Sequence, residues 1–297
     1  MTTVNLNPAG LEPAAAEICP PGREAWRMFR RNIAAVAGLV MLCTIVLVCV
    51  LGPVVFPVDP FEIVWAPLTP PGESEYLFGT DYLGRDVLAG IVYGGKATLV
   101  VGITAALLSV VIGVTIGALA GYHGGWVDSL MMRITEFFQV LPALLLAMAL
   151  ITLFSPTLTT ITVAIGIVSW PAVARLARAE FLRIKQLEFV RAARAISASD
   201  ARIILRVILP NALPPLIVMA ALNTGTAILF EAGLSFLGLG DPSQMSWGMM
   251  IGSNRDYILS AWWPVTLPGI AIFLTVLSIS LIGDGLNDAF NPKLRER

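Results

Sequence analysis

The hydropathy of the chain alternates between long apolar runs and short polar segments. A run of about 20 apolar residues is long enough to cross the hydrocarbon core of a bilayer as a helix. The apolar runs predict helices at residues 33–56, 99–120, 134–154, 158–174, 212–232 and 264–282. The sequence therefore predicts an all-α integral membrane protein with six transmembrane helices.

The positive charges are distributed unevenly between the two sides of this arrangement. Of the 19 lysine and arginine residues, only Arg85, Lys96 and Arg255 fall on one side. Lysine and arginine collect in cytoplasmic loops, so the other side, with both termini, is predicted to be cytoplasmic. The predicted segments are a cytoplasmic tail at 1–32, the first helix at 33–56, an extracytoplasmic loop with a short interfacial helix at 57–95, a core at 96–288 and a second cytoplasmic tail at 289–297.

Composition excludes several classes of protein. The chain is 57% hydrophobic and 13% charged, which is typical of a membrane protein rather than a soluble one. A net charge of −1 gives no reason to expect a nucleic-acid partner. One histidine and three scattered cysteines offer no material for a metal site or a catalytic triad, so we expect no catalytic residue, no metal and no cofactor.

A polar and basic stretch at 187–211 interrupts the apolar pattern. Phe189, Ala192, Ala193 and Ile196 follow the i, i+3, i+4, i+7 spacing of one helix face. A break follows at 197–200, where Ser199 or Asp200 is suited to cap a second helix. A short helix, a turn and a membrane-anchored helix suit docking into a groove of a partner protein, whereas the alternative is an amphipathic helix that lies on the membrane.

This stretch resembles the EAA loop of ATP-binding-cassette (ABC) importer permeases, which inserts a coupling helix into the ATPase subunit. The two alanines after Arg191 match, as does Ile208-Leu209-Pro210, but Arg191 replaces the family's glutamate and Ser197 its glycine. If the turn needs a positive φ, serine costs about 1 kcal/mol there. The resemblance implies that the ATPase contacts involve Phe189, Arg191, Ala192, Ala193, Ile196, Ser197 and Asp200.

A second motif narrows the resemblance to the peptide and nickel permeases. The sequence GTDYLGRD at 79–86, followed by Tyr93-Gly94 and Thr98-Leu99, is similar to their signature, and so are SFLGLG at 235–240 and the C-terminal GDGLNDAFNP. For Asp81, Arg85 and Asp86 we expect a salt-bridged corner that fixes the loop. The chain is most similar to the second, shorter-looped permease of these importers.

The resemblance implies a type I ABC importer permease fold with a cytoplasmic coupling helix, in the bacterial cytoplasmic membrane. The implied partners are a homologous second permease, two ABC ATPase subunits, an extracytoplasmic solute-binding protein and membrane lipid, with no nucleic acid. The chain has no phosphate-binding G-x-x-x-x-G-K-S/T loop, so hydrolysis is left to the ATPases and the chain is not expected to be an enzyme. Peptides, nickel or another small solute are the implied cargo.

Polar and proline residues inside the predicted helices are candidates for the translocation path or gate. Glu136 is either the partner of Arg133 at i, i+3 or a polar group at the inner mouth. Pro142 is predicted to kink its helix. The remaining candidates are Asn223, Thr226 and Glu231, of which Glu231 must face protein or the path. The alternative function is an ion-gradient-driven secondary transporter, whose proton relay would rest on Glu136 and Glu231.

Overall fold

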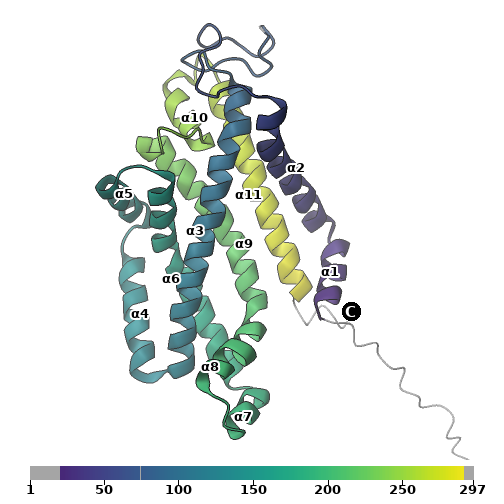
Figure 1. Ribbon diagram of the computed structural model, residues 1–297, viewed down its shortest axis with the longest axis vertical. Coiled ribbons are helices and arrows are strands. Elements are labelled where there is room, and N and C mark those ends of the chain that lie inside the picture. The colour runs from purple at the N-terminus through teal and green to yellow at the C-terminus, as the bar shows by residue number, and fades with distance from the viewer. Residues whose placement is uncertain (1–20, 74, 291–297) are drawn as a thin grey trace, which may run out of the picture.

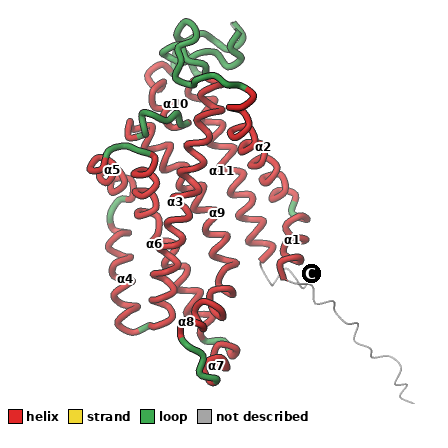
Figure 2. Tube along the Cα trace, viewed as in Figure 1, coloured by secondary structure: helices red, strands yellow, loops and turns green. Residues whose placement is uncertain are grey.

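The computed structural model describes residues 21–73 and 75–290, so the predicted tails at 1–20 and 291–297 lie outside the described residues. Figure 1 shows long helices packed side by side, with an irregular cap at one end and the short helices α7 and α8 at the other. Figure 2 shows that loops gather mainly at the cap, where residues 56–86 fold over the helix ends.

Within residues 21–73 and 75–290, five helices are long and apolar enough to cross a membrane. They are α2 (Ile33–Val55), α3 (Val87–His123), α6 (Leu158–Lys185), the composite helix Asp200–Leu239 that contains α9 (Leu209–Leu234), and α11 (Trp263–Phe290). A bent pair, α4 (Gly125–Val140) and α5 (Ala143–Phe154), makes the sixth crossing if both helices belong to one span. The predicted fold class is therefore confirmed.

Shorter elements complete the described chain. They are α1 (Pro21–Arg31), α7 (Glu188–Ala195), α8 (Asp200–Arg202), π-helical segments at Ile203–Ile208 and Ser235–Leu239, α10 (Trp247–Asn254) and a 3-10 turn at Arg255–Tyr257. The first of these corrects the predicted tail at 1–32, because residues 21–31 are helical. Phe29 of α1 is buried and packs with Ala289 of α11, so an apolar anchor fixes this helix.

The third predicted helix is broken rather than kinked. Helix α4 starts at Gly125, before the predicted start at 134, and stops at Val140. The bend between α4 and α5 is 86°. Leu141 has an extended backbone, with ψ of 130°, because the ring of Pro142 disfavours the helical conformation in the residue before it.

Helix α3 runs unbroken from Val87 to His123, so the separate interfacial helix predicted before the second span does not form. The side chain of Asp86 caps its first turn by accepting a hydrogen bond from Leu88 N at 2.8 Å. No proline stops the helix between this cap and the apolar run, so the two predicted segments merge. The predicted boundary at 95–96 falls inside this helix.

The most extensive contact between two helices of the described bundle joins α3 to α6. Gly113, Gly117 and Gly121 form a stripe on α3 that faces α6. A Cβ atom at Gly117 would lie 2.3 Å from the carbonyl oxygen of Ala174, so only glycine allows this approach. Phe181 of α6 is fully buried near the end of the stripe, beside Gly121. These contacts make α3 and α6 one packed unit.

The cap at the opposite end from α7 contains the Asp81–Asp86 motif. The carboxylate of Asp81 accepts hydrogen bonds from Leu83 N and Arg85 N at 2.8 Å each. The guanidinium of Arg85 lies over the ring of Phe61, 5.2 Å from its centroid. No ion pair joins Arg85 to either aspartate among residues 75–290, so the prediction of a salt-bridged corner is wrong.

Backbone amides take the place of the expected salt bridge in the cap. Burial raises the pKa of both Asp81 and Asp86 above their ordinary value, and the backbone N–H groups that bond them oppose this rise. The cap is also tied to the bundle, because Trp263 Nε1 donates to the carbonyl oxygen of Thr80 at 3.0 Å and Tyr82 N donates to Asn254 Oδ1 at 3.0 Å.

Candidate functional site

The first candidate site is α7 and the turn that follows it. Two residues separate the end of α6 from the start of α7. Helix α7 lies at the extreme end of the helical bundle, below the long helices (Figure 1). Val190 is fully buried and attaches α7 to the bundle. On the predicted docking face, Phe189 is 45% exposed and Ile196 is 81% exposed. Two large apolar side chains are therefore exposed on α7 and the turn after it, beside Ala192 and Ala193.

The turn after α7 needs the backbone conformation that glycine favours. Ser197 has φ of +56°, in the left-handed region. The chain then enters α8 at Asp200 without the predicted side-chain cap, because neither Ser199 nor Asp200 accepts a capping bond there. Asp200 instead accepts a hydrogen bond from the hydroxyl of Tyr122 on α3. Ile203 and Ile208 are buried and anchor the following helix.

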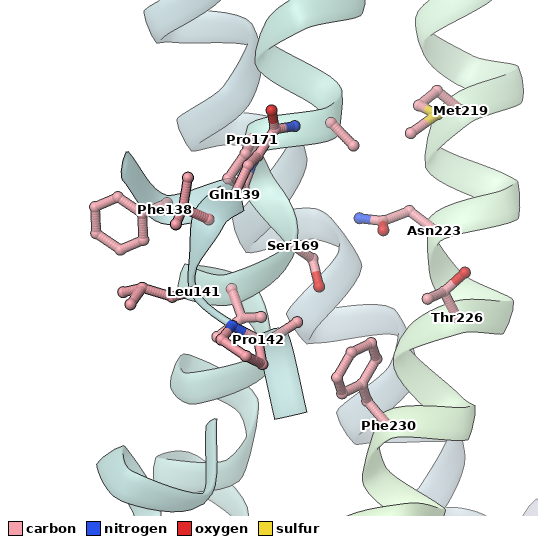
Figure 3. Close-up of a pocket in the computed structure, with 14 residues that line it drawn as sticks. Phe138, Gln139, Leu141, Pro142, Ser169, Pro171, Met219, Asn223, Thr226 and Phe230 are labelled. Atoms are coloured by element: carbon pink, nitrogen blue, oxygen red, sulfur yellow. The ribbon is translucent and has the colours of Figure 1, made fainter. Parts of the chain in front are cut away.

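The second candidate site is a pocket of about 440 Å³ between α4, α5, α6 and α9. Figure 3 shows Met219, Asn223, Thr226 and Phe230 in a row along α9, with Ser169 and Pro142 on the other side of the space. The remaining lining residues are Phe138, Gln139, Val140, Leu141, Ala143, Val168, Pro171 and Ala172. None of the described residues that line the pocket is ionisable.

Three of the five predicted path residues meet at this pocket: Pro142, Asn223 and Thr226. Pro142 reaches it because the break before α5 turns the chain toward α6. The side chain of Asn223 is 6% exposed and donates to the hydroxyl of Ser109 on α3, so it holds α9 against α3 as well as lining the pocket. Thr226 is exposed and free to meet a solute, although its hydroxyl bonds to Leu222 O at 3.2 Å.

The two predicted acidic residues lie away from the pocket. Glu136 is exposed on α4 and makes no ion pair with Arg133 in the described part of the chain. Glu231 is 1% exposed inside the bundle, where its Oε1 accepts a hydrogen bond from Ser235 Oγ at 2.8 Å. Glu231 therefore faces protein, which is one of the two orientations predicted for it.

Sequence reasoning missed the pocket residues Ser169, Met219 and Phe230. Residues 219, 223, 226 and 230 repeat at helical spacing, so extending the polar pair Asn223 and Thr226 by one turn each way would have found two of them. Ser169 carries no such signal. Its place depends on how α6 crosses α9, which the pattern of one helix does not show.

Comparison with known proteins decides the family. Residues 113–296 match the family described as the binding-protein-dependent transport system inner membrane component. Residues 20–71 match the N-terminal transmembrane domain of oligopeptide transport permease C. The chain belongs to the family of binding-protein-dependent permeases.

Individual relatives agree with this family. The permease is 42% identical over 282 residues to the di/tripeptide transport system permease protein DppC of Pseudomonas aeruginosa, covering 93% of each chain. It is 41% identical over 278 residues to the dipeptide transport system permease protein DppC of Bacillus subtilis, covering 92% of this chain and 86% of the relative. It is 37% identical over 277 residues to the glutathione transport system permease protein GsiD of Pectobacterium atrosepticum, covering 93% and 92%.

A solved structure confirms the fold. The permease resembles a chain of the MetNI methionine ABC transporter, from a structure titled for its inward facing conformations, with a TM-score of 0.56 and 22% identity. The match covers 67% of the permease and 95% of that chain. The family match and the relatives, rather than this structure, show that the permease is a multi-pass inner-membrane subunit of an ATP-driven, binding-protein-dependent importer. These comparisons support this function and not the secondary transporter.

Proposed function

We propose that the permease forms half of a translocation path for short peptides, beside a homologous second permease, and that an ABC ATPase subunit docks on α7. The observation that carries the proposal is the exposed apolar face of α7. Phe189 is 45% exposed and Ile196 is 81% exposed at a polar end of the molecule. Exposure of such large apolar side chains does not stabilise an isolated subunit and is typical of an interaction site. A groove in a partner protein would bury both side chains.

The charges near α7 are consistent with a cytoplasmic location. Arg183, Arg191, Arg194 and Arg202 all lie on or near α7 and the adjoining helix ends. Such a concentration of arginine marks the cytoplasmic side of an inner-membrane protein. We therefore assign α7 and both termini to the cytoplasm and the 56–86 cap to the outside, where a solute-binding protein would deliver the cargo.

The pocket fits a cargo of variable charge. Its polar groups are the neutral side chains of Gln139, Ser169, Asn223 and Thr226, and its apolar lining includes Met219. A fixed charge in the lining would attract peptides of opposite charge and repel those of like charge. A neutral lining passes short peptides whatever their side chains, which agrees with the dipeptide and tripeptide cargo that the relatives' names state.

The permease has no role in hydrolysis under this proposal. ATP binding and hydrolysis belong to two ATPase subunits, and their closure moves α7. A transport cycle follows because ATP favours one arrangement of the helices over the other by its differential affinity for the two.

The test of the docking face is Ala193→Asp. Ala193 lies on α7 between Phe189 and Ile196 and is half-buried, because it packs in part against the buried cluster that contains Val190. A carboxylate there would be unpaired at the base of the proposed interface. We expect the variant to reach the membrane normally. Its affinity for the ATPase should fall by about a hundredfold or more, so that the ATPase no longer co-purifies and dipeptide uptake is lost.

Ser197→Gly is the matched control in the same loop. Glycine removes the cost of a positive φ and touches no side chain of the docking face. We expect this variant to keep normal uptake and normal ATPase binding. Full ATPase binding by Ala193→Asp would show that α7 docks through another face or not at all.

A further inference from the structure

One tyrosine of α3 makes contacts with three other elements, α6, α7 and α8, at the α7 end of the molecule. Tyr122, in the last turn of α3, is 5% exposed. Its hydroxyl donates to Asp200 Oδ1, at the start of α8. Its backbone carbonyl accepts a hydrogen bond from the Nζ of Lys185, the last residue of α6. We name Tyr122, Lys185, Arg194 and Asp200 the tyrosine latch.

Two cations complete the latch by packing on the aromatic ring. The Cζ atom of Arg194, on α7, lies 5.3 Å from the ring centroid of Tyr122, and the Nζ of Lys185 lies 5.5 Å from it. Both distances are within the range in which the ring quadrupole attracts a cation. One side chain therefore holds α7 and α8 by directional polar contacts to the ends of α3 and α6.

The apolar contacts beneath the latch do not replace it. Val190, Phe181 and Ile203 belong, together with the ring of Tyr122, to one buried cluster that attaches α7 and α8 to the bundle. Apolar burial is non-directional, so such a cluster tolerates small sliding displacements of one helix past another. Hydrogen bonds and charged contacts have a narrow range of geometry, so the latch fixes the register of α7 against α3 and α6.

The connection from α8 to α9 is of a different kind. The chain passes through the π-helical segment Ile203–Ile208 before α9 begins. Such segments interrupt the regular helical hydrogen bonding. A displacement of α7 would therefore reach α9 through an irregular segment, whereas it would reach α3 and α6 through fixed polar contacts.

We propose that Tyr122 is the positioning residue through which movement of α7 is transmitted to the α3–α6 unit, and so to one wall of the pocket. Residues Val168, Ser169, Pro171 and Ala172 of α6 form that wall, and α9 forms the wall opposite. Because the glycine stripe locks α3 to α6, the two helices move together. The proposal rests on the proposed function, since it assumes that an ATPase subunit moves α7.

The experiment measures ATP hydrolysed and radiolabelled alanyl-alanine taken up by the same proteoliposomes, which contain the complete importer. Tyr122→Phe keeps the ring and both cation contacts and removes only the bond to Asp200. We expect this variant to bind its ATPases and hydrolyse ATP, but to use about tenfold more ATP per dipeptide, the effect of one hydrogen bond to a charged group. Asp200→Ala should raise the same ratio equally, and the double variant should raise it no further.

Tyr93→Phe is the matched control at the other end of α3. Like Tyr122, Tyr93 donates a hydrogen bond from its hydroxyl, but its acceptor is the backbone carbonyl of Phe56, at 3.3 Å. Tyr93 lies near the start of α3, far along the helix from α7. We expect its ratio of ATP to dipeptide to equal that of the unsubstituted permease. Asp200 is exposed, so Asp200→Ala gives the answer if Tyr122→Phe accumulates poorly.

Four other results would contradict either the role of Tyr122 or the proposed function. An unchanged ratio in Tyr122→Phe or Asp200→Ala would overturn the latch, and so would an equal rise in Tyr93→Phe. Loss of ATPase binding by both latch variants would also overturn it, because Tyr122 would then shape the docking face rather than transmit movement. Failure of the unsubstituted importer to bind an ATPase or take up the dipeptide would refute the proposed function itself.

Discussion

At the scale of single residues, Ser197 and Glu231 are two positions where the residue type conflicts with its surroundings. Ser197 adopts φ of +56°, which costs a non-glycine residue about 1 kcal/mol, yet it sits in the turn that presents α7. Glu231 places a carboxyl group inside a membrane bundle, where its Oε2 is buried without a hydrogen-bond partner among the described residues. The hydroxyls of Thr98 and Ser246 lie beside it.

Substitution of Glu231 tests whether this polar group is structural. Glu231→Gln keeps an oxygen that can accept from Ser235 and adds N–H donors for the neighbouring hydroxyls, so we expect near-normal membrane abundance and uptake. Glu231→Lys places an unpaired cation in the same enclosed space, at a cost of several kcal/mol, so we expect the protein to be lost from the membrane. Quantitative immunoblotting of membranes gives the readout. Equal, normal abundance of both variants would show that Glu231 is hydrated.

At the scale of elements, the α3–α6 pair is the most constrained contact in the bundle. The glycine stripe brings the two backbones close, and the positions that face it on α6 include Ala174 and Ala177. In a membrane, packing of small residues supplies much of the association energy between helices, because lipid is as apolar as a leucine side chain. The rigidity of this pair is what allows movement at one end of α6 to reach the pocket.

Gly117→Ala is predicted to weaken this pair. The added Cβ would lie 2.3 Å from Ala174 O and 2.7 Å from Ala177 Cβ, so the helices must separate, at a cost of about 1–3 kcal/mol. Gly233→Ala on α9 is the control, because a Cβ there meets nothing within 4 Å. Thermal unfolding in detergent should show a lowered midpoint for Gly117→Ala alone. A midpoint equal to that of the unsubstituted protein would mean that the stripe is not in close contact.

The sequence predicted the helices better than their ends. Five of the six apolar runs became continuous helices and the run at 134–154 became two, because a bilayer leaves the backbone no other hydrogen-bond partners. The runs did not predict the ends: α3 begins 12 residues before its predicted start at 99, because polar and small residues continue a helix that Asp86 caps. Pro142 signalled the disturbance in the third helix, but the size of the bend depends on packing against α6.

The residues of the pocket were predicted in part. Asn223 and Thr226 could be found because polar residues in an apolar helix are visible in the sequence. Ser169 could not, because its place opposite them depends on how α6 crosses α9.

At the scale of the whole molecule, α6 links the two candidate sites. It starts at Leu158 near the cap end, supplies Ser169 to the pocket and ends at Lys185 in the tyrosine latch. Figure 1 shows α6 running from the level of α5 down to α8. A single helix thus passes from the proposed ATPase contact to the wall of the path, and the opposite wall belongs to α9.

Filling the pocket tests whether it is the path. Thr226 is exposed to the space of about 440 Å³, and the larger indole of Thr226→Trp would project into that space and narrow it. We expect dipeptide uptake to fall to about a tenth or less, while the ATPases still co-purify, because α7 lies at the far end of the molecule. Leu229→Trp is the control, since Leu229 lies on the same helix, is 52% exposed and does not line the pocket. Normal uptake by Thr226→Trp would place the path elsewhere, and equal loss in both variants would show that α9 tolerates no added bulk.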